Sequence, residues 1–443
     1  MSGSIGAGVL IVVADRLIDG TGRAAVPRGA IAVMDERILA LDSPEALAAR
    51  FPGAQRHEFP GGTLLPGFVD SHVHSTFSAG AVPFEDIQAD GDLVVGLRGA
   101  INARDALQAG VTTMRDLGGR DRTTLQLRDA IASGVVPGPR LLVCGRPVTI
   151  PSGHLHFLGG VAKGVDGVSA LVRELLEEGV DVIKVIATGG NMTVTSDPLA
   201  AQFSREEIAA MTRLASAAGR RVTAHARGVE GIRAAVEGGV NNIEHCRMEV
   251  PPGEWRFDQP LAREMVARGI TAAPTLAASY RAFQRQAAGG RVGIRKGAIP
   301  FETRLANAAR LREAGVRVVV GTDAGAALAR FDEAVHVEME SLVQAGWTPL
   351  EAIEAATLGA AIAIGRDREL GSLAPGKLAD VVVVQGDPGR AISDVRHVEA
   401  VFLGGRLVVQ AGHATLDARP LPWPADQVSQ RTVYRTTDVK QAR

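Results

Sequence analysis

Several features that would place this chain in a specialised class of protein are scarce in its sequence. Its 443 residues include only two cysteines, Cys144 and Cys246, which are too few for a disulfide framework and favour a reduced, cytoplasmic setting. The formal net charge is −1, and no long run of lysine or arginine occurs, so neither nucleic acid nor an anionic membrane is expected as the main partner. Aromatic residues make up only 4% of the chain. Alanine and glycine are abundant instead, which suits closely packed helices.

Long hydrophobic runs are also missing. No uninterrupted apolar stretch reaches the roughly 18 residues that a membrane-spanning helix needs. The N-terminal segment MSGSIGAGVLIVVADRLIDG has no basic region ahead of its short apolar stretch and no plausible cleavage site. We therefore expect this segment to form the first β-strand rather than a signal peptide, and we expect no membrane as a partner.

The pattern of apolar residues predicts an α/β fold. Residues 1–63 alternate short apolar strands with DGTG and PGG turns, as in a small β unit. From Leu64 onward, buried strands alternate with amphipathic helices such as 169–179, 204–219 and 304–315, each of which closes on glycine. A series of eight strand–helix units predicts a closed (β/α)8 barrel, or TIM barrel. Its strands are expected to end near His74, Arg115, Cys144, Lys184, His225, His245, Thr275 and Asp323.

The two ends of the chain are expected to form a second domain together. One more helix is predicted over 348–365, with Thr348 at its start. The strand-like segments LADVVVVQGDP and VEAVFLGGRLVVQAG follow it. We predict a small composite β-sandwich domain from 1–63 and 366–443, and a barrel domain over 64–365.

Polar side chains with affinity for metals recur at intervals that a barrel would bring together. In GFVDSHVH, His72 and His74 are two residues apart, so in a strand both point to the same face and both can ligate an ion such as Zn²⁺. His225, His245 and Asp323 each follow an apolar strand. A lone histidine in such a place is more often a satisfied buried residue than a ligand. Because burying three such groups without partners would cost several kcal/mol in total, we predict that all five residues form one metal centre.

A lysine accompanies these residues. Lys184 ends the apolar strand VDVIK, where a charged ammonium is unfavourable and its pKa should fall. A neutral lysine amine can add carbon dioxide and become a carbamate, whose two oxygens can bridge two metal ions. The alternative is a buried ion pair with Asp323 or Glu244. Beside the other metal-binding residues, we favour N6-carboxylation of Lys184.

Longer motifs occur in a fixed order along nearly the whole chain: LLPGFVDSHVH, GVTTMRDLGG, IKVIATGG, TAHARG, IEHC, GTDAG and LGSLAPGKLADVVVV. With these motifs the chain resembles the amidohydrolase superfamily, in the branch of imidazolonepropionase-like and Xaa-Pro dipeptidase-like enzymes. The resemblance implies a hydrolase of carbon–nitrogen bonds in a small molecule. It also implies a homo-oligomer and two divalent metal ions, most simply Zn²⁺, although Mn²⁺, Fe²⁺ or Co²⁺ would suit the same ligands.

The resemblance also assigns roles to the metal-binding residues. One ion would be held by His72, His74 and Asp323, the second by His225 and His245, and carboxylated Lys184 would bridge the two. Two such ions turn water into a bridging hydroxide nucleophile and polarise a carbonyl group. Asp323 would act as the general acid/base that moves a proton from the nucleophile to the leaving amine.

Three further residues are candidates for binding the substrate. His154, on the loop after the third strand, matches a histidine of the relatives and could polarise the scissile carbonyl or hold a carboxylate. Arg227 stands where dipeptidase-like relatives often have a tyrosine and imidazolonepropionase-like ones a histidine. Its fork can grip a substrate carboxylate, or it forms a structural ion pair with Glu230 or Glu244. Tyr280 either lines the pocket or packs against neighbouring residues.

The leading hypothesis is a binuclear hydrolase that cleaves the amide bond of an N-acyl amino acid, an Xaa-Pro-like dipeptide or an aryl amide such as an ochratoxin-like compound. A cyclic amidase of the imidazolonepropionase type is the nearest alternative. A mononuclear deaminase is a weaker one, since deaminases of this superfamily lack the bridging lysine and carry a glutamate where this chain has Gly228. A metal-free scaffold is a third alternative, and the complete ligand set argues against it.

Overall fold

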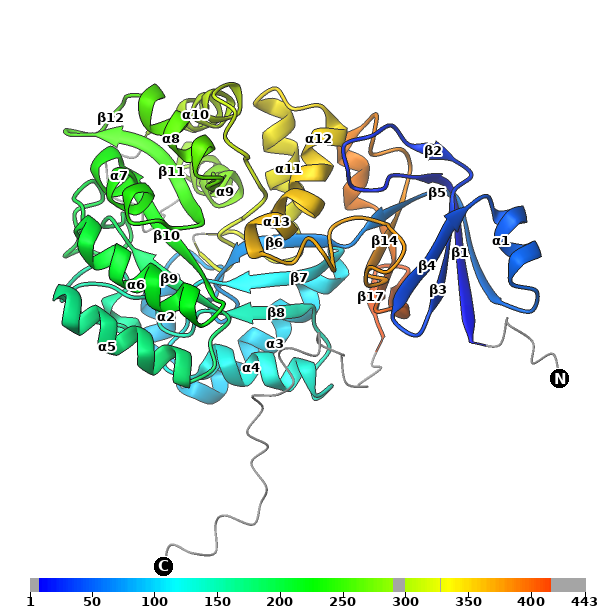
Figure 1. The fold of residues 1–443 in the computed structure, drawn as a ribbon, viewed down its shortest axis with the longest axis horizontal. Coiled ribbons are helices and arrows are strands. Elements are labelled where there is room, and N and C mark those ends of the chain that lie inside the picture. The colour runs from blue at the N-terminus through cyan, green and yellow to red at the C-terminus, as the bar shows by residue number, and fades with distance from the viewer. Residues whose placement is uncertain (1–7, 290–298, 327, 416–443) are drawn as a thin grey trace, which may run out of the picture.

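The computed structural model describes residues 8–289, 299–326 and 328–415, and it confirms a mixed α/β fold. In Figure 1 the N-terminal strands, in blue, lie beside the C-terminal strands, in orange, at one end of the molecule. A larger body of alternating strands and helices makes up the rest. Within the described ranges, no helix is both long and apolar enough to cross a bilayer.

One sheet combines strands from both ends of the chain. Its order is β17-β16-β15-β14-β5-β1-β3-β4, with β2 paired to β1. The antiparallel pairing of β5 with β14, in which Leu64 lies opposite Val383, joins the two chain ends. The strands are β1 (Val9–Leu17), β2 (Val26–Pro27), β3 (Ala30–Met34), β4 (Arg37–Asp42), β5 (Gln55–Pro66), β14 (Val381–Gln385), β15 (Val398–Leu403), β16 (Arg406–Gln410) and β17 (His413–Ala414).

The larger body contains parallel strands whose neighbours form a ring. Strands β6, β7 and β8 pair in one parallel sheet, and β9, β10, β11 and β13 pair in another. Three isolated parallel bridges close the gaps: Val148 with Val185, Ala272 with Val318, and Val73 with Ala324. The parallel strands are β6 (Phe68–Val73), β7 (Val111–Asp116), β8 (Arg140–Val143), β9 (Val182–Ile186), β10 (Arg221–Gly228), β11 (Asn242–Val250) and β13 (Thr271–Ala273). The short strand β12 (Glu254–Trp255) pairs antiparallel with β11.

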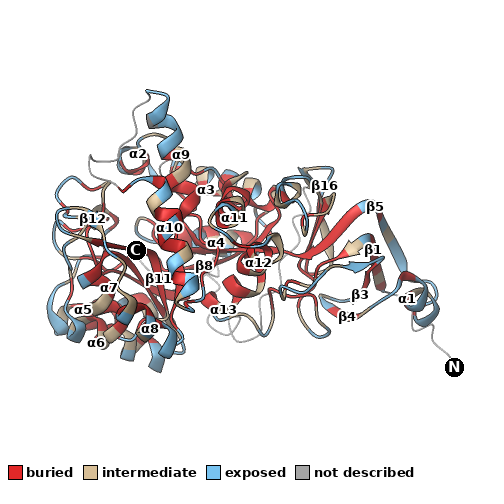
Figure 2. Cartoon of the chain, turned by 90° about the horizontal axis from the view of Figure 1, so that it is seen from above, coloured by how far each residue is buried: buried red, intermediate tan, exposed pale blue. Residues whose placement is uncertain are grey.

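Helices surround this ring, and their exposed faces turn outward while the strands are buried (Figure 2). Capping boxes at Ser204 and Thr348 start two of the helices, so the predicted start at Thr348 is confirmed. The helices are α1 (Pro44–Arg50), which lies beside the composite sheet, α2 (Pro83–Ala89), α3 (Asp92–Gln108), α4 (Thr123–Ala132), α5 (Gly164–Glu177), α6 (Arg205–Ala217), α7 (Val229–Glu237), α8 (Gln259–Ala267), α9 (Leu276–Ala287), α10 (Phe301–Glu313), α11 (Ala334–Gln344), α12 (Pro349–Glu354) and α13 (Ala360–Ile364).

The single helix predicted over 348–365 is interrupted. A π-helical turn, Ala355–Gly359, separates α12 from α13. The carbonyl of Ala355 accepts a hydrogen bond from the Val320 amide at 3.0 Å. The widened turn therefore contacts the backbone that leads to Asp323.

Most of the predicted strand ends lie within three residues of the observed ends. His245 differs, because β11 continues to Val250 with positive φ angles at His245, Cys246 and Met248. Asp323 follows a segment that joins its neighbours through backbone hydrogen bonds and isolated bridges rather than through a regular strand. After His225 and His245, buried apolar residues alternate with Arg227 and Arg247, and the strands continue past both histidines.

Candidate metal centre and substrate pocket

An open pocket of about 700 Å³ gathers most of the predicted site residues. It is bordered by residues that lie far apart in the sequence and come from β6, β9, β10, β11 and the segment after Val318. The predicted residues that line it are His72, His74, His154, Lys184, His225, Arg227, His245 and Asp323.

The first group of candidate ligands is His72, His74 and Asp323. The Nε2 atoms of both imidazoles lie 3.5 Å from Asp323 Oδ1. Asp70 holds these segments together, since it accepts hydrogen bonds from the backbone amides of His72 (3.2 Å) and Thr322 (3.0 Å). The Asp323 amide in turn donates to the His72 carbonyl at 2.8 Å. The ligand atoms offered by the three residues all lie within 4.8 Å of one another, close enough to share one cation.

The remaining ring nitrogen of each of these histidines faces an acceptor. His74 Nδ1 lies 3.0 Å from the Gly118 carbonyl, which can only accept, so the ring proton sits on Nδ1. His72 Nδ1 lies 3.0 Å from the buried carboxylate oxygen Oε2 of Glu244. Both contacts leave the Nε2 lone pairs directed at the site, as metal ligands require.

His225 and His245 form the second group. His225 Nε2 donates to the Gly189 carbonyl at 3.0 Å, and His245 Nδ1 lies 2.8 Å from the Thr275 hydroxyl. His225 Nδ1 and His245 Nε2 then face each other at 2.9 Å. The Gly189 carbonyl fixes the proton of His225 on Nε2, so its Nδ1 directs a lone pair at His245. His245 Nε2 either donates to that lone pair, with the Thr275 hydroxyl donating to Nδ1, or meets it with a second lone pair, an arrangement that a bound cation would stabilise. Burial lowers the pKa values of both imidazoles well below their usual range, so both are neutral at neutral pH.

Lys184 lines the same pocket as both groups, and its amine has no hydrogen-bond partner among the described residues. Its side chain is 1% exposed. Burial lowers the pKa of Lys184 to about 8. The ion pair considered from the sequence is therefore not formed with Asp323 or Glu244. A buried amine that is readily neutral and unpaired fits carboxylation.

Two of the candidate ligands have strained backbones. His245 has φ 66° and Asp323 has φ 60°, in the left-handed region that residues other than glycine rarely adopt. Such strain persists only where surrounding structure enforces it, and it concentrates at functional sites.

Glu244 was not predicted as part of the site, although it supports His72. Its other oxygen, Oε1, accepts from Arg115 Nη2 at 3.0 Å and from the Thr223 hydroxyl at 2.5 Å. Burial alone would raise the pKa of Glu244, but His72, Lys184 and Arg115 together hold it below its usual range. Arg115 does not pair with its neighbour Asp116. The Asp116 carboxylate accepts instead from Ser75 and from the Gly118 amide, in the loop that supports His74.

His154 faces the second group of ligands. Its ring centroid lies 4.8 Å from that of His225, and its Nδ1 lies 2.8 Å from the Thr193 hydroxyl. That hydroxyl accepts the Leu155 amide proton, so its own proton can go to Nδ1, which leaves a proton on Nε2. Gly190 makes room for the ring, because a Cβ there would lie 2.5 Å from it. His156, two residues further on, donates from Nδ1 to the Gly153 carbonyl at 2.9 Å and is not among the described residues that line the pocket.

The other two predicted substrate contacts differ from expectation. Arg227 lines the pocket, but its ion-pair partner is Glu249, at 2.6 Å and 2.8 Å, rather than Glu230 or Glu244. Tyr280 is not among the described side chains that line the pocket; its ring packs on Phe301 with centroids 5.3 Å apart. The side chain before it, Ser279, lines the pocket instead. Helix α9 begins at Leu276, so its rotation directs Tyr280 away.

The comparisons with known proteins agree with this architecture. The model of the amidohydrolase family matches residues 63–408. The chain therefore belongs to the amidohydrolase family, and it is a hydrolase that acts on carbon–nitrogen bonds.

Several relatives extend over most of the chain. Ochratoxinase from Aspergillus niger is 28% identical, over 90% of this chain and 86% of its own, and its crystal structure superposes with a TM-score of 0.80. The crystal structure of a Xaa-Pro dipeptidase with bound methionine in the active site has a TM-score of 0.81 and 27% identity, over 90% of this chain and 99% of that one. Imidazolonepropionase from Symbiobacterium thermophilum is 26% identical over 92% of this chain and 97% of its own.

Proposed function

We propose that the protein is a binuclear metal-dependent amidohydrolase that cleaves the amide bond of an N-acyl amino acid, an Xaa-Pro-like dipeptide or an aryl amide such as an ochratoxin-like compound. One observation carries the proposal. His225 Nδ1 and His245 Nε2 meet at 2.9 Å while their outer nitrogens face the Gly189 carbonyl and the Thr275 hydroxyl. This arrangement is suited to a shared cation.

The fold supports the proposal, because a closed ring of parallel strands is the arrangement found in a (β/α)8 barrel. The sheet formed by both chain ends would be the small β-sandwich domain. The domain limits 1–63, 64–365 and 366–443 remain predictions. Strand β5 runs through the first of these limits to Pro66.

The donor set fits two divalent ions, most simply Zn²⁺. His72, His74 and Asp323 would hold one, His225 and His245 the other, and Lys184, carboxylated at Nζ, would contact both. Bound ions of this kind activate water and polarise a carbonyl group.

The chain's own residues would then move the proton and orient the substrate. Burial raises the pKa of Asp323, against the opposing effects of His72 and Lys184, so this carboxylate is a better base than an exposed one. Its Oδ2 would take a proton from the attacking water and return it to the nitrogen of the leaving amine. His154, neutral because burial and Arg227 lower its pKa to about 3, would donate from Nε2 to the scissile carbonyl or a substrate carboxylate.

The Xaa-Pro dipeptidase structure holds methionine in its active site, which favours an amino acid as one product. The cyclic amidase remains a second candidate, because the imidazolonepropionase relative matches 97% of its own length. A deaminase is less favoured. Any side chain at Gly228 would place its Cβ 2.4 Å from the Leu199 carbonyl, so the position cannot carry a glutamate without rearrangement.

The test is metal analysis combined with an amide panel. The purified protein should contain about two divalent ions per chain and hydrolyse at least one N-acetyl amino acid, Xaa-Pro dipeptide or aryl amide, rather than only a cyclic imidazolone. Asp323→Asn should lower kcat by roughly 10²-fold or more, whereas the exposed Asp42→Asn should not. Full activity after removal of all divalent ions would contradict the proposal. A homo-oligomeric state, a cytoplasmic setting and the absence of nucleic-acid or membrane partners stay predictions from the sequence.

A further inference from the structure

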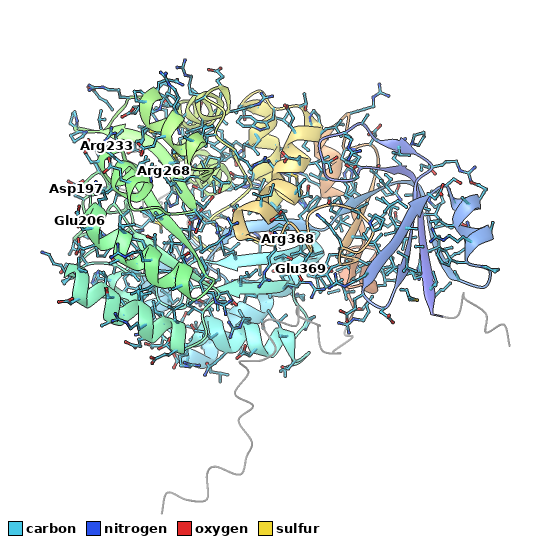
Figure 3. All side chains as sticks on the ribbon, viewed as in Figure 1. Asp197, Glu206, Arg233, Arg268, Arg368 and Glu369 are labelled. Carbon is cyan, nitrogen blue, oxygen red and sulfur yellow. The ribbon has the colours of Figure 1, made fainter. Side chains whose placement is uncertain are left out.

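Three arginines, Arg227, Arg247 and Arg304, line one wall of the pocket, and we call them the arginine wall. They come from β10, β11 and α10. Arg227 is 3% exposed and Arg304 is 8% exposed. Arg233 and Arg268, labelled in Figure 3, differ from these, since they lie on α7 and directly after α8 and their side chains are 37% and 45% exposed.

The arginine wall has more positive charge than its surroundings balance. Glu249, 1% exposed, lies behind it and does not line the pocket. Its oxygens contact Arg227 Nη2 at 2.6 Å and 2.8 Å, and Arg247 Nη1 only at 3.9 Å. Arg304 donates hydrogen bonds to the Ser279 hydroxyl and the Ile299 carbonyl, and both of these acceptors are neutral. Among the described residues, three guanidinium groups therefore share one carboxylate, apart from the candidate metal ligands.

The wall also has unused hydrogen-bond donors. Nε and Nη1 of Arg227 and Nε of Arg247 are buried without a partner among the described residues. Buried charged donors without partners are costly, so such groups are usually completed by a ligand or by water. Because Arg227 and Arg247 line the pocket beside His225 and His245, a bound substrate is the group in position to complete them.

We propose that the arginine wall binds two carboxylates of the substrate, so that the preferred substrates are N-acyl derivatives of aspartate or glutamate, or dipeptides that end in one of them. This inference rests on the proposed amide hydrolysis. Arg227, nearest in sequence to the ligand His225, would hold the α-carboxylate, and Arg247 and Arg304 would hold the side-chain carboxylate. A planar guanidinium binds a carboxylate well, because its paired N–H groups match the two carboxylate oxygens. Two carboxylates would balance the two excess positive charges.

The test compares charged and neutral substrates of equal shape on the metal-loaded protein. N-acetyl-L-glutamate should have a kcat/KM about tenfold to a hundredfold above that of N-acetyl-L-glutamine, since a charge-assisted hydrogen bond discriminates on that scale. Arg304→Gln and Arg247→Gln should each reduce this ratio about tenfold and mainly through KM, with the metal content unchanged. Arg268→Gln, an exposed arginine in an ion pair with Glu264, is the matched control and should leave the ratio as it is.

A second readout separates this inference from the proposed function. L-Glutamate, which cannot be hydrolysed, should raise the melting temperature of the metal-loaded protein more than L-glutamine does, and Arg304→Gln should abolish the difference. Hydrolysis of neutral and acidic N-acetyl amino acids at equal kcat/KM, with equal melting shifts, would overturn the arginine wall and leave the proposed function standing. A melting shift specific to L-glutamate without hydrolysis of any amide would support the wall and contradict the proposed function. The inference would also be overturned if Arg304→Gln and Arg247→Gln lowered kcat/KM equally for N-acetyl-L-glutamate and N-acetyl-L-glutamine. That result would show that the two arginines have a structural role only.

Discussion

His72 and Glu244 form a buried contact in which Nδ1 lies 3.0 Å from Oε2. The carboxylate also pairs with Arg115 through its other oxygen at 3.0 Å. Glu244 therefore serves two partners, one of which is a candidate metal ligand. This contact fixes the ring orientation of His72 and balances a fully buried arginine.

Glu244→Gln should weaken both functions. Glutamine keeps only one acceptor oxygen, so it cannot present an acceptor to both His72 and Arg115, and without the negative charge Arg115 is left as an uncompensated buried cation. We expect metal affinity to fall about 10–100-fold and the free energy of unfolding to fall by about 3–5 kcal/mol. Metal content after dialysis and urea unfolding measure the two effects. Glu58→Gln, which breaks the surface pair with Arg56, is the control and should change stability by less than about 1 kcal/mol.

Gly190→Ala should disturb His154 and nothing else in the site. The added methyl group would lie 2.5 Å from the His154 ring, so the ring must move. If His154 contacts the substrate, kcat/KM should fall about 10²-fold while the metal content stays the same. The double variant with His154→Ala should be no worse than His154→Ala alone. The control is Gly167→Ala, a position in α5 with open space around it. If the losses of the two single variants added up in the double variant, that would argue against a contact of His154 with the substrate.

The clustering of the candidate ligands could be predicted from the sequence because most of them lie on, or directly after, parallel strands whose carboxyl ends meet. The side-chain alternation of a strand placed His72 and His74 on one face, and the structure directs both toward Asp323. The same periodicity does not hold along β11, where His245, Cys246 and Met248 have positive φ angles and Arg247 lines the pocket while Glu249 does not.

Other parts of the site could not be found this way. Glu244 and His245 are adjacent, so a regular strand would direct them to opposite faces. The left-handed backbone of His245 breaks that alternation, and both side chains reach the interior. Arg304 comes from a helix more than fifty residues further along, and only tertiary packing brings it to the wall. For Tyr280 the sequence left pocket lining and packing open, because it does not show where the first turn of α9 begins, and the structure agrees with packing.

Carboxylation of Lys184 should depend on pH in a defined direction. Burial lowers the pKa of Lys184 to about 8, so the amine is mostly neutral only above that pH, and only the neutral amine adds carbon dioxide. Metal-stripped protein should therefore regain its metal in bicarbonate faster above pH 8 than below it, with a mass gain of one carbon dioxide. Lys184→Met should show neither change and should bind fewer ions, whereas the exposed Lys163→Met should behave as the wild type does. Equal recovery on both sides of pH 8, or recovery in Lys184→Met, would argue against a carbamate.

Glu338 offers a test of how burial sets the pH dependence of stability. This carboxyl group on α11 accepts the backbone amides of Leu276 (3.0 Å) and Ala277 (2.6 Å) at the start of α9. Burial raises its pKa to about 8 from an ordinary value of 4.5, although both amides oppose the shift. Between these two values the folded state holds a proton that the unfolded state has lost, so the contribution of Glu338 to the free energy of unfolding must decrease as pH rises.

Glu338→Gln removes that titration while keeping an oxygen that can accept one of the two amides. The difference in free energy of unfolding between wild type and Glu338→Gln should therefore be largest near pH 4.5, shrink as pH rises through the window, and stop changing above about pH 8. Urea unfolding of the metal-free proteins at several pH values measures it, because metal binding would otherwise add its own pH dependence. Parallel stability curves for the two proteins would mean that the carboxyl group ionises normally inside the fold. In that case its two amide hydrogen bonds would outweigh the cost of its burial, and Glu338 would serve as an ionised cap for α9.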